Sequence, residues 1–264
     1  MAVRSIQYRF QAAQVLIRDA GKIALDLFRN LERLQLEKKG AHDWVSNADR
    51  EVEMIIRKRL GDLFPEDGFL GEEFGILGKD KSGLWVVDPI DGTTCFLRGI
   101  SSWCVSIAFV VKNIIEIGLI YSPCTDELFA VRRGFGATIN GRQMKPSNAK
   151  SLSEGIVGIG YAPKNSIDPT KKAFDFLFKE GGVYQDIGSA ALMIAYVAAG
   201  RYIGFYEYHL NSWDCLAGIA MVREIGGYTN DFLANNGLHE GNPVLVSVPG
   251  TKKAMLNLFN SAGH

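Results

Sequence analysis

Leu84-Trp85-Val86-Val87-Asp88-Pro89-Ile90-Asp91-Gly92-Thr93-Thr94 is the stretch on which the interpretation of this chain depends. Its apolar start, Leu84 to Val87, predicts a buried strand that ends at Pro89, because proline cannot donate a ladder hydrogen bond. Gly92 allows a tight turn, and the two threonines then open a helix or turn with amides free to face an anion. Carboxylates and amides therefore meet at one strand end, and together they can hold Mg²⁺ and a phosphate group.

The composition predicts a folded protein with a core of its own. The 264 residues are enough for one large domain or two small lobes, and 47% of them are apolar. Lys+Arg and Asp+Glu both total 29, a balance that argues against a non-specific nucleic-acid binder. The four cysteines lack CxxC spacing and predict reduced thiols. No run approaches the ~20 apolar residues of a membrane span, so we expect a cytoplasmic protein.

Apolar periodicity predicts helices at the start of the chain, strands in the middle and both kinds of element towards the end. Predicted helices are 5–35, the segment after Asp49, 174–178, 189–199, 213–225 and 252–259. Predicted strands are 69–70, 84–87, 105–111, 114–121, 128–131, 156–160, 202–206 and 244–248, with turns at Lys112-Asn113 and Asn140-Gly141. This order favours an α+β fold, a single domain of residues 1–264 whose two packed lobes span roughly 1–150 and 151–264.

Acidic residues mark the ends of several predicted elements. They are Asp49, the pair Glu72-Glu73, the pair Asp88 and Asp91, and Asp214. Asp88 and Asp91 flank Pro89, so both carboxylates can face one cavity. Asp49 and Asp214 also fit the simpler role of helix caps, and Glu72-Glu73 fits a solvated loop pair. Spacing alone therefore brings only Asp88 and Asp91 together.

Three segments resemble, in order, the signatures of the inositol monophosphatase family. They are Gly71-Glu72-Glu73, Asp88-Pro-Ile-Asp-Gly-Thr-Thr94 and Trp213-Asp214-x-x-Ala217-Gly218. Further similar segments are Val45-Ser46-x-Ala48-Asp49, Gly188-Ser189-Ala190-Ala191 and Tyr206-Glu207. The resemblance covers nearly the whole chain. It implies a layered αβαβα sandwich of the sugar-phosphatase type, and Mg²⁺-dependent hydrolysis of phosphate monoesters such as inositol monophosphate.

The resemblance implies two or three Mg²⁺ ions with oxygen ligands. Glu72, Asp88 and the carbonyl of Ile90 would hold the first ion. Asp88, Asp91 and Asp214 would hold the second, and a third, weaker ion would rest mainly on Glu72 and waters.

The resemblance also implies a mechanism in which water attacks phosphorus in line without a covalent enzyme intermediate. The attacking water would lose its proton toward Glu72, helped by the hydroxyl of Thr93, and Asp91 would be required for turnover. The amides of Gly92 and Thr93 would hold phosphate oxygens. The two remaining acidic residues, Asp49 and Glu73, would orient metal ligands or waters.

Substrate contacts follow from the same resemblance. Glu207 resembles the family's acceptor for sugar hydroxyls, and Asp91, Ser189 and Ala190 resemble its remaining contacts to the polyol, with Asp214 beside the leaving oxygen. A small phosphorylated polyol is therefore the expected substrate. A homodimer and inhibition by millimolar-scale lithium are further expectations.

Departures from the family pattern leave other functions open. Asp186 and Ile187 stand where many relatives carry arginine, which weakens the case for family-type dimer contacts and for a basic partner surface there. The same chemistry on histidinol phosphate, fructose-1,6-bisphosphate or 3′-phosphoadenosine nucleotides is one alternative. A non-enzymatic partner of transcription or RNA machinery is another, which the neutral charge and the missing arginines near Gly188 disfavour.

Overall fold

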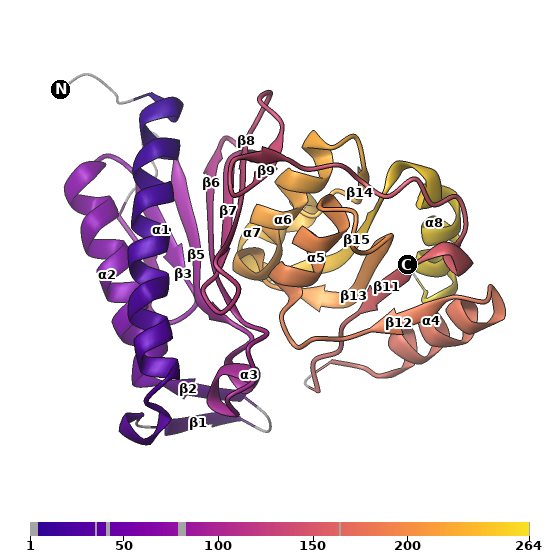
Figure 1. Cartoon of the computed structure of the whole chain (residues 1–264), viewed down its shortest axis with the longest axis horizontal. Helices are drawn as coiled ribbons and strands as arrows, with labels where there is room; N and C mark the ends of the chain where they lie inside the picture. The colour runs from indigo at the N-terminus through magenta and orange to yellow at the C-terminus, as the bar shows by residue number, and fades with distance from the viewer. Residues whose placement is uncertain (1–4, 35, 41–42, 79–82, 164, 264) are drawn as a thin grey trace.

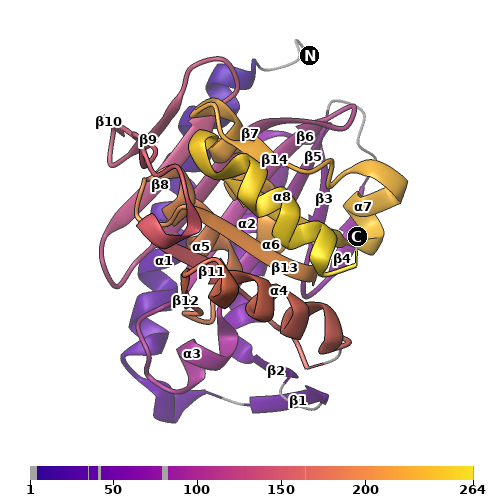
Figure 2. The ribbon, with the colours of Figure 1, turned by 90° about the vertical axis from the view of Figure 1, so that its right-hand side faces the viewer.

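The computed structural model describes residues 5–34, 36–40, 43–78, 83–163 and 165–263 (Figure 1). Among the described residues, the two larger of three sheets alternate with three pairs of helices, and the third sheet has two short strands. The first pair, α1 (Ile6–Phe28) and α2 (Asn47–Leu63), covers one face of the larger sheet. The pair α5 (Ala190–Ala198) and α6 (Ser212–Glu224) lies between the sheets, and α4 (Asp168–Lys179) and α8 (Lys252–Ser261) cover the outer face of the smaller sheet (Figures 1 and 2). The predicted αβαβα arrangement is confirmed.

The larger sheet has eight strands in the order β10-β9-β8-β7-β6-β5-β3-β4. Their bounds are β3 (Gly68–Gly71), β4 (Gly75–Leu77), β5 (Leu84–Asp91), β6 (Cys104–Val111), β7 (Ile114–Ser122), β8 (Glu127–Arg132), β9 (Ala137–Ile139) and β10 (Arg142–Gln143). Strands β3 and β5 are parallel and the other neighbours are antiparallel. The tight turn predicted at Lys112-Asn113 is confirmed, since both residues have positive φ.

The smaller sheet has five strands in the order β12-β11-β13-β15-β14. Their bounds are β11 (Ile156–Ile159), β12 (Val183–Gln185), β13 (Gly204–Leu210), β14 (Tyr228–Thr229) and β15 (Asn242–Ser247). The remaining elements are short. They are η1 (Leu31–Arg33), β1 (Leu36–Gly40), β2 (Asp43–Ser46), α3 (Thr93–Leu97), η2 (Leu152–Glu154), η3 (Ala234–Asn236), α7 (Gly237–Glu240) and η4 (Pro249–Thr251).

Strand β5 separates two hydrophobic cores. Trp85 and Val87 pack with α1 and α2 on one face, and Leu84 and Val86 pack with α5 and α6 on the other. Burial on both faces explains why this strand is a continuous apolar run. On the α6 side the helix backbone comes very close to β7, because a Cβ built on Gly118 would lie 2.6 Å from the carbonyl oxygen of Ala217.

Several predicted boundaries are wrong. The first helix ends at Phe28 instead of residue 35, and the strand expected over 202–206 runs from Gly204 to Leu210. Strand β5 does not end at Pro89 but continues to Asp91, and its pairing with β6 becomes irregular between Asp88 and Asp91. The proline is tolerated there because an irregular pairing does not need its missing N–H.

Helices α5 and α6 pack against both sheets. We therefore propose that residues 1–264 form one domain. Within the part of the chain that the structure describes, we find no helix with the length and apolar character of a membrane span.

Candidate functional site

Three carboxylates meet where β5 ends and α6 begins. Oxygen atoms of Asp88, Asp91 and Asp214 all lie within 4.8 Å of one another. The irregular pairing at the end of β5 presents both of its aspartates, and both are buried. Asp214 also caps its helix, with Oδ2 accepting the N–H of Asn211 at 2.8 Å. Asp214 can therefore cap α6 and also belong to the acidic cluster, because a carboxylate has two oxygen atoms.

Glu72, on the turn between β3 and β4, lies beside this cluster but is not one of the three residues within 4.8 Å of one another. Its carboxyl group lies close enough to that of Asp88 for each to affect the pKa of the other. Burial raises the pKa of Glu72 well above its usual value, and repulsion from Asp214, Glu73 and Asp49 adds to the shift. Burial and the neighbouring carboxylates likewise raise the pKa of Asp88. Acidic groups held together against their own repulsion fit a divalent cation, which would neutralise them.

Asp91 is held by the start of α5. Its Oδ2 accepts a short hydrogen bond from the Ser189 hydroxyl, a second from the Ala191 N–H at 2.8 Å and a weak one from the Cys104 thiol at 3.8 Å. Burial raises the pKa of Asp91 to about 6, although these hydrogen bonds act in the opposite direction. Ser189, for which the resemblance implied a substrate contact, is fully buried. Its hydroxyl orients Asp91 instead of lining the pocket.

Thr93 lies between a buried carboxylate and a backbone carbonyl of β5. Its Oγ1 is 3.1 Å from the Ile90 carbonyl oxygen and 3.5 Å from Oδ1 of Asp49. Oδ2 of Asp49 accepts the N–H and the hydroxyl of Ser46, both at 2.8 Å, in the capping box of α2. Burial raises the pKa of Asp49 to about 6. Asp49 thus belongs to the capping box of α2 and also accepts a long hydrogen bond from Thr93.

A cavity of about 190 Å³ opens beside the acidic cluster. Asp91 and Asp214 line it together with Ala190 and Glu207, two residues expected to contact the substrate. Glu207 is buried and packs so closely on Gly160 that a Cβ there would lie 2.1 Å from its Oε2.

Some residues that line the cavity were not predicted from the sequence to contact a substrate. Asp186 and Tyr161 line it. Asp186 stood out only as a departure from the family pattern, and no sequence signal marked Tyr161. Oδ1 of Asp186 accepts the N–H of Gly188 at 2.8 Å.

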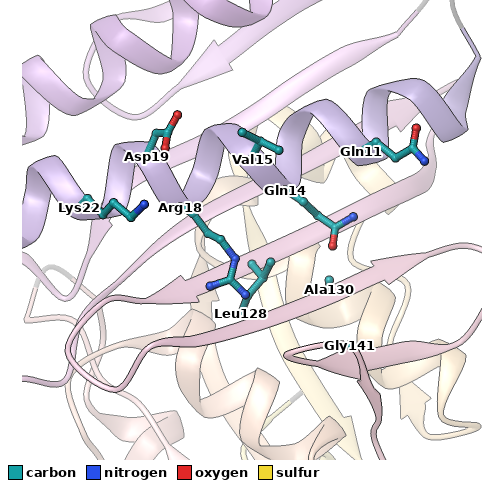
Figure 3. Close-up of a pocket in the computed structure, with 9 residues that line it drawn as sticks. All are labelled: Gln11, Gln14, Val15, Arg18, Asp19, Lys22, Leu128, Ala130 and Gly141. Carbon is teal, nitrogen blue, oxygen red and sulfur yellow. The ribbon is translucent and has the colours of Figure 1, made fainter.

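A larger cavity of about 380 Å³ lies elsewhere, between α1, β8 and the turn at Gly141 (Figure 3). Arg18, Asp19 and Lys22 line it, and Asp19 is ion-paired with Arg59 at 2.8 Å. Of the residues described, none is common to this cavity and to the acidic cluster. Size alone therefore does not identify the candidate site.

Comparison with known proteins shows which family the chain belongs to. The model of the inositol monophosphatase family matches residues 6–261. This chain belongs to the inositol monophosphatase family. Membership confirms the resemblance drawn from the three motifs, and the family is one of metal-dependent phosphatases that act on small phosphorylated substrates.

Relatives within the family carry two kinds of name. The inositol-1-monophosphatase of Rhizobium meliloti is 39% identical over 229 residues, covering 86% of this chain and 83% of the relative. The Nus factor SuhB of Escherichia coli K12 is 36% identical over 242 residues, covering 90% and 91%. Among solved structures, the extragenic suppressor protein suhB of Bartonella henselae superposes with a TM-score of 0.88 at 34% identity, covering 96% and 97%.

Proposed function

We propose that this chain is a Mg²⁺-dependent phosphate monoester hydrolase acting on inositol monophosphate or a similar small polyol phosphate. The observation that carries the proposal is the cluster of Asp88, Asp91 and Asp214, of which Asp91 and Asp214 line a cavity that Glu207 also lines. Carboxylates would bind the metal on one side of this cavity, and Glu207 would accept hydroxyl hydrogen bonds from the polyol on the other. Membership of the family supports the proposal.

The ligand set contains only oxygen atoms, which suits Mg²⁺. Glu72, Asp88 and the Ile90 carbonyl would hold one ion, and Asp88, Asp91 and Asp214 a second. When bound, the metal supplies a more acidic water and neutralises charge on the phosphate. Asp91 has one oxygen committed to Ser189 and Ala191, so its other oxygen is the one left for a ligand.

The protein's own groups would move the proton and hold the phosphate. The attacking water would pass its proton to Glu72, or through the Thr93 hydroxyl to Asp49, whose Oδ1 is 3.5 Å from Thr93 Oγ1. The amides of Gly92 and Thr93 would bind phosphate oxygens. Ala190 and Glu207 would position the polyol so that its ester oxygen faces Asp214.

The test is Mg²⁺-dependent phosphate release across a substrate panel with Asp91→Asn alongside. The panel contains inositol-1-phosphate, fructose-1,6-bisphosphate, histidinol phosphate and 3′-phosphoadenosine-5′-phosphate. We expect a preference for inositol-1-phosphate and a loss of roughly 10²-fold or more in kcat for Asp91→Asn, because several kcal/mol of metal stabilisation are at stake.

The matched control is Asp175→Asn, which removes a carboxylate of α4 far from the acidic cluster and leaves the site intact. Wild-type turnover by Asp91→Asn would exclude the proposed ligand set. Preference for another phosphate on the panel would keep the chemistry and change the substrate.

A second candidate function is a non-enzymatic role as a partner of transcription or RNA machinery. The relatives named Nus factor SuhB support it. A folded protein that binds Mg²⁺ and hydrolyses nothing on the panel would favour it. Lithium inhibition, a homodimer and a cytoplasmic location stay predictions.

A further inference from the structure

Glu53 is a fully buried carboxylate of α2 that lies outside the proposed ligand set. Its Oε2 accepts the backbone N–H of Glu73 at 2.8 Å, and its Oε1 accepts that of Phe74 at 3.3 Å. Both amides belong to the turn between β3 and β4, which carries Glu72. Glu53 therefore satisfies the backbone of the turn that presents a metal-site carboxylate.

Arg57, one helical turn after Glu53, holds the same turn from its other end. Its Nε donates to Oε1 of Glu53 at 3.1 Å, and its Nη2 donates to the carbonyl of Gly75, the first residue of β4. Its guanidinium carbon lies 4.5 Å from the ring centroid of Phe69 in β3. Burial raises the pKa of Glu53, while Arg57 and the two turn amides oppose that rise. The pair thus satisfies a buried charge that would otherwise be costly.

Gly71, at the end of β3, leaves room for the Glu53 carboxylate. A Cβ built on Gly71 would lie 2.1 Å from Oε1 of Glu53, so no larger residue fits beside it. The Glu72 N–H donates to the carbonyl of Val87 in β5 at 3.2 Å. The turn is therefore fixed to β5 on one side and to α2 on the other, with Glu72 between the two attachments.

We propose that Glu53 and Arg57 form a positioning pair that holds Glu72 in reach of Asp88 and so sets the affinity of the site for its metal. This inference rests on the proposed role of Glu72 as a metal ligand. Neither residue contacts the substrate in this scheme. They act through the backbone of the turn, as outer residues around metal ligands commonly do.

The experiment compares Glu53→Gln with Glu51→Gln, an exposed residue two positions earlier on the same helix. In Glu53→Gln the new amide group keeps the shape of the side chain but faces the turn with a donor where an acceptor is needed. We expect Mn²⁺, used as a paramagnetic probe and measured by electron paramagnetic resonance, to bind roughly 10–100-fold more weakly to Glu53→Gln. We also expect faster hydrogen exchange at the Glu73 and Phe74 amides, with neither change in Glu51→Gln.

Arg57→Lys tests the pair while keeping a cation beside the buried Glu53 carboxylate. It keeps the cation but cannot hold both Glu53 and the Gly75 carbonyl in a fixed geometry. We expect an intermediate loss of Mn²⁺ affinity, which serves as the test should Glu53→Gln not fold. A lowered Tm with unchanged Mn²⁺ affinity and unchanged exchange in both variants would overturn the proposal and leave a purely structural ion pair.

Failure of the proposed function would look different. A wild-type protein that does not bind Mn²⁺ would remove the metal role of Glu72. Exchange at the Glu73 and Phe74 amides would in that case still show whether Glu53 holds the turn.

Discussion

Gly92 has a backbone conformation on which the positions of its neighbours in the candidate site, Asp91 and Thr93, depend. Its φ is +95°, and a Cβ built on it would lie 2.9 Å from the Ser102 carbonyl oxygen and 3.2 Å from that of Gly188. Both the positive φ and the close approach exclude a side chain here. The same residue precedes Thr93 and follows Asp91, so an error in its conformation would displace groups on both sides.

We predict that Gly92→Ala costs more stability than Gly134→Ala, a matched control. Gly134 has a φ of +80° and open space around its built Cβ, so alanine there meets only the backbone penalty of about 1–2 kcal/mol. At position 92 the contacts with two carbonyls add roughly 1–3 kcal/mol. Denaturant unfolding of both variants measures the difference, and equal losses would show that the backbone near Gly92 yields to a methyl group.

At the scale of elements, helix α5 contributes to the site through its first residues. Ser189 caps the helix by accepting the Leu192 N–H at 3.3 Å while its own hydroxyl binds Asp91. Ser5 caps α1 by accepting the Tyr8 N–H at 3.2 Å. The two serines thus share one structural role and differ in their distance from the candidate metal ligands.

We predict that Ser5→Ala lowers the free energy of unfolding by about 1 kcal/mol, the usual value of a cap, and that Ser189→Ala lowers it further because the buried Asp91 also loses a hydrogen bond. Only Ser189→Ala should also weaken Mg²⁺ binding, by roughly 10-fold, because Asp91 loses the donor that orients it. Isothermal titration calorimetry with Mg²⁺ separates the two effects. Unchanged affinity in Ser189→Ala would mean that the Ala191 amide alone is enough to hold Asp91.

The elements also show where sequence reasoning succeeded. The apolar run of β5 and the turn at Lys112-Asn113 are local signals, and both were predicted. The prediction that the strand ends at Pro89 is wrong. Whether a strand tolerates proline depends on how its partner pairs with it, and here the pairing with β6 is irregular. The substrate contact implied for Ser189 did not anticipate its burial, since packing against Asp91 arises only when distant elements meet.

At the scale of the whole molecule, the acidic cluster joins strands of the larger sheet to a helix that packs between the sheets. Spacing could bring together only Asp88 and Asp91, and the resemblance supplied Glu72 and Asp214. Glu53 had no sequence signal that distinguished it from other helical glutamates. Its position became evident from the turn that it contacts.

We predict that Mg²⁺ stabilises the protein more at about pH 7.5 than at about pH 5.5. Burial raises the pKa of Asp49 and Asp91 from 3.8 to about 6, so the folded state binds more protons than the unfolded state between these values. The metal-free protein therefore loses stability as pH rises through this window, and each ionised carboxylate costs on the order of 3 kcal/mol above it. Mg²⁺ offsets the cost at Asp91, the proposed ligand of the two, only where that carboxylate is ionised.

The measurement is Tm with and without Mg²⁺ at both pH values. A concentration of about 100 Kd corresponds to roughly 2.7 kcal/mol, or a rise of about 5–10 °C at the higher pH. Asp214→Asn is the control and should reduce this rise. Equal increases at both pH values would contradict the assignment of Asp91 as a Mg²⁺ ligand.

The close approach of Gly118 to Ala217 has a consequence for how the protein can vary. Helix α6 carries Asp214 at its first turn and rests its backbone directly on β7 at this point. A side chain at position 118 would clash with the backbone of α6, and we expect the helix to shift and to move Asp214 relative to Asp88 and Asp91. Substitutions in the interior, far along the chain from the acidic residues, can therefore be expected to change the geometry of the candidate metal site, and Gly118 is a position where this effect can be tested.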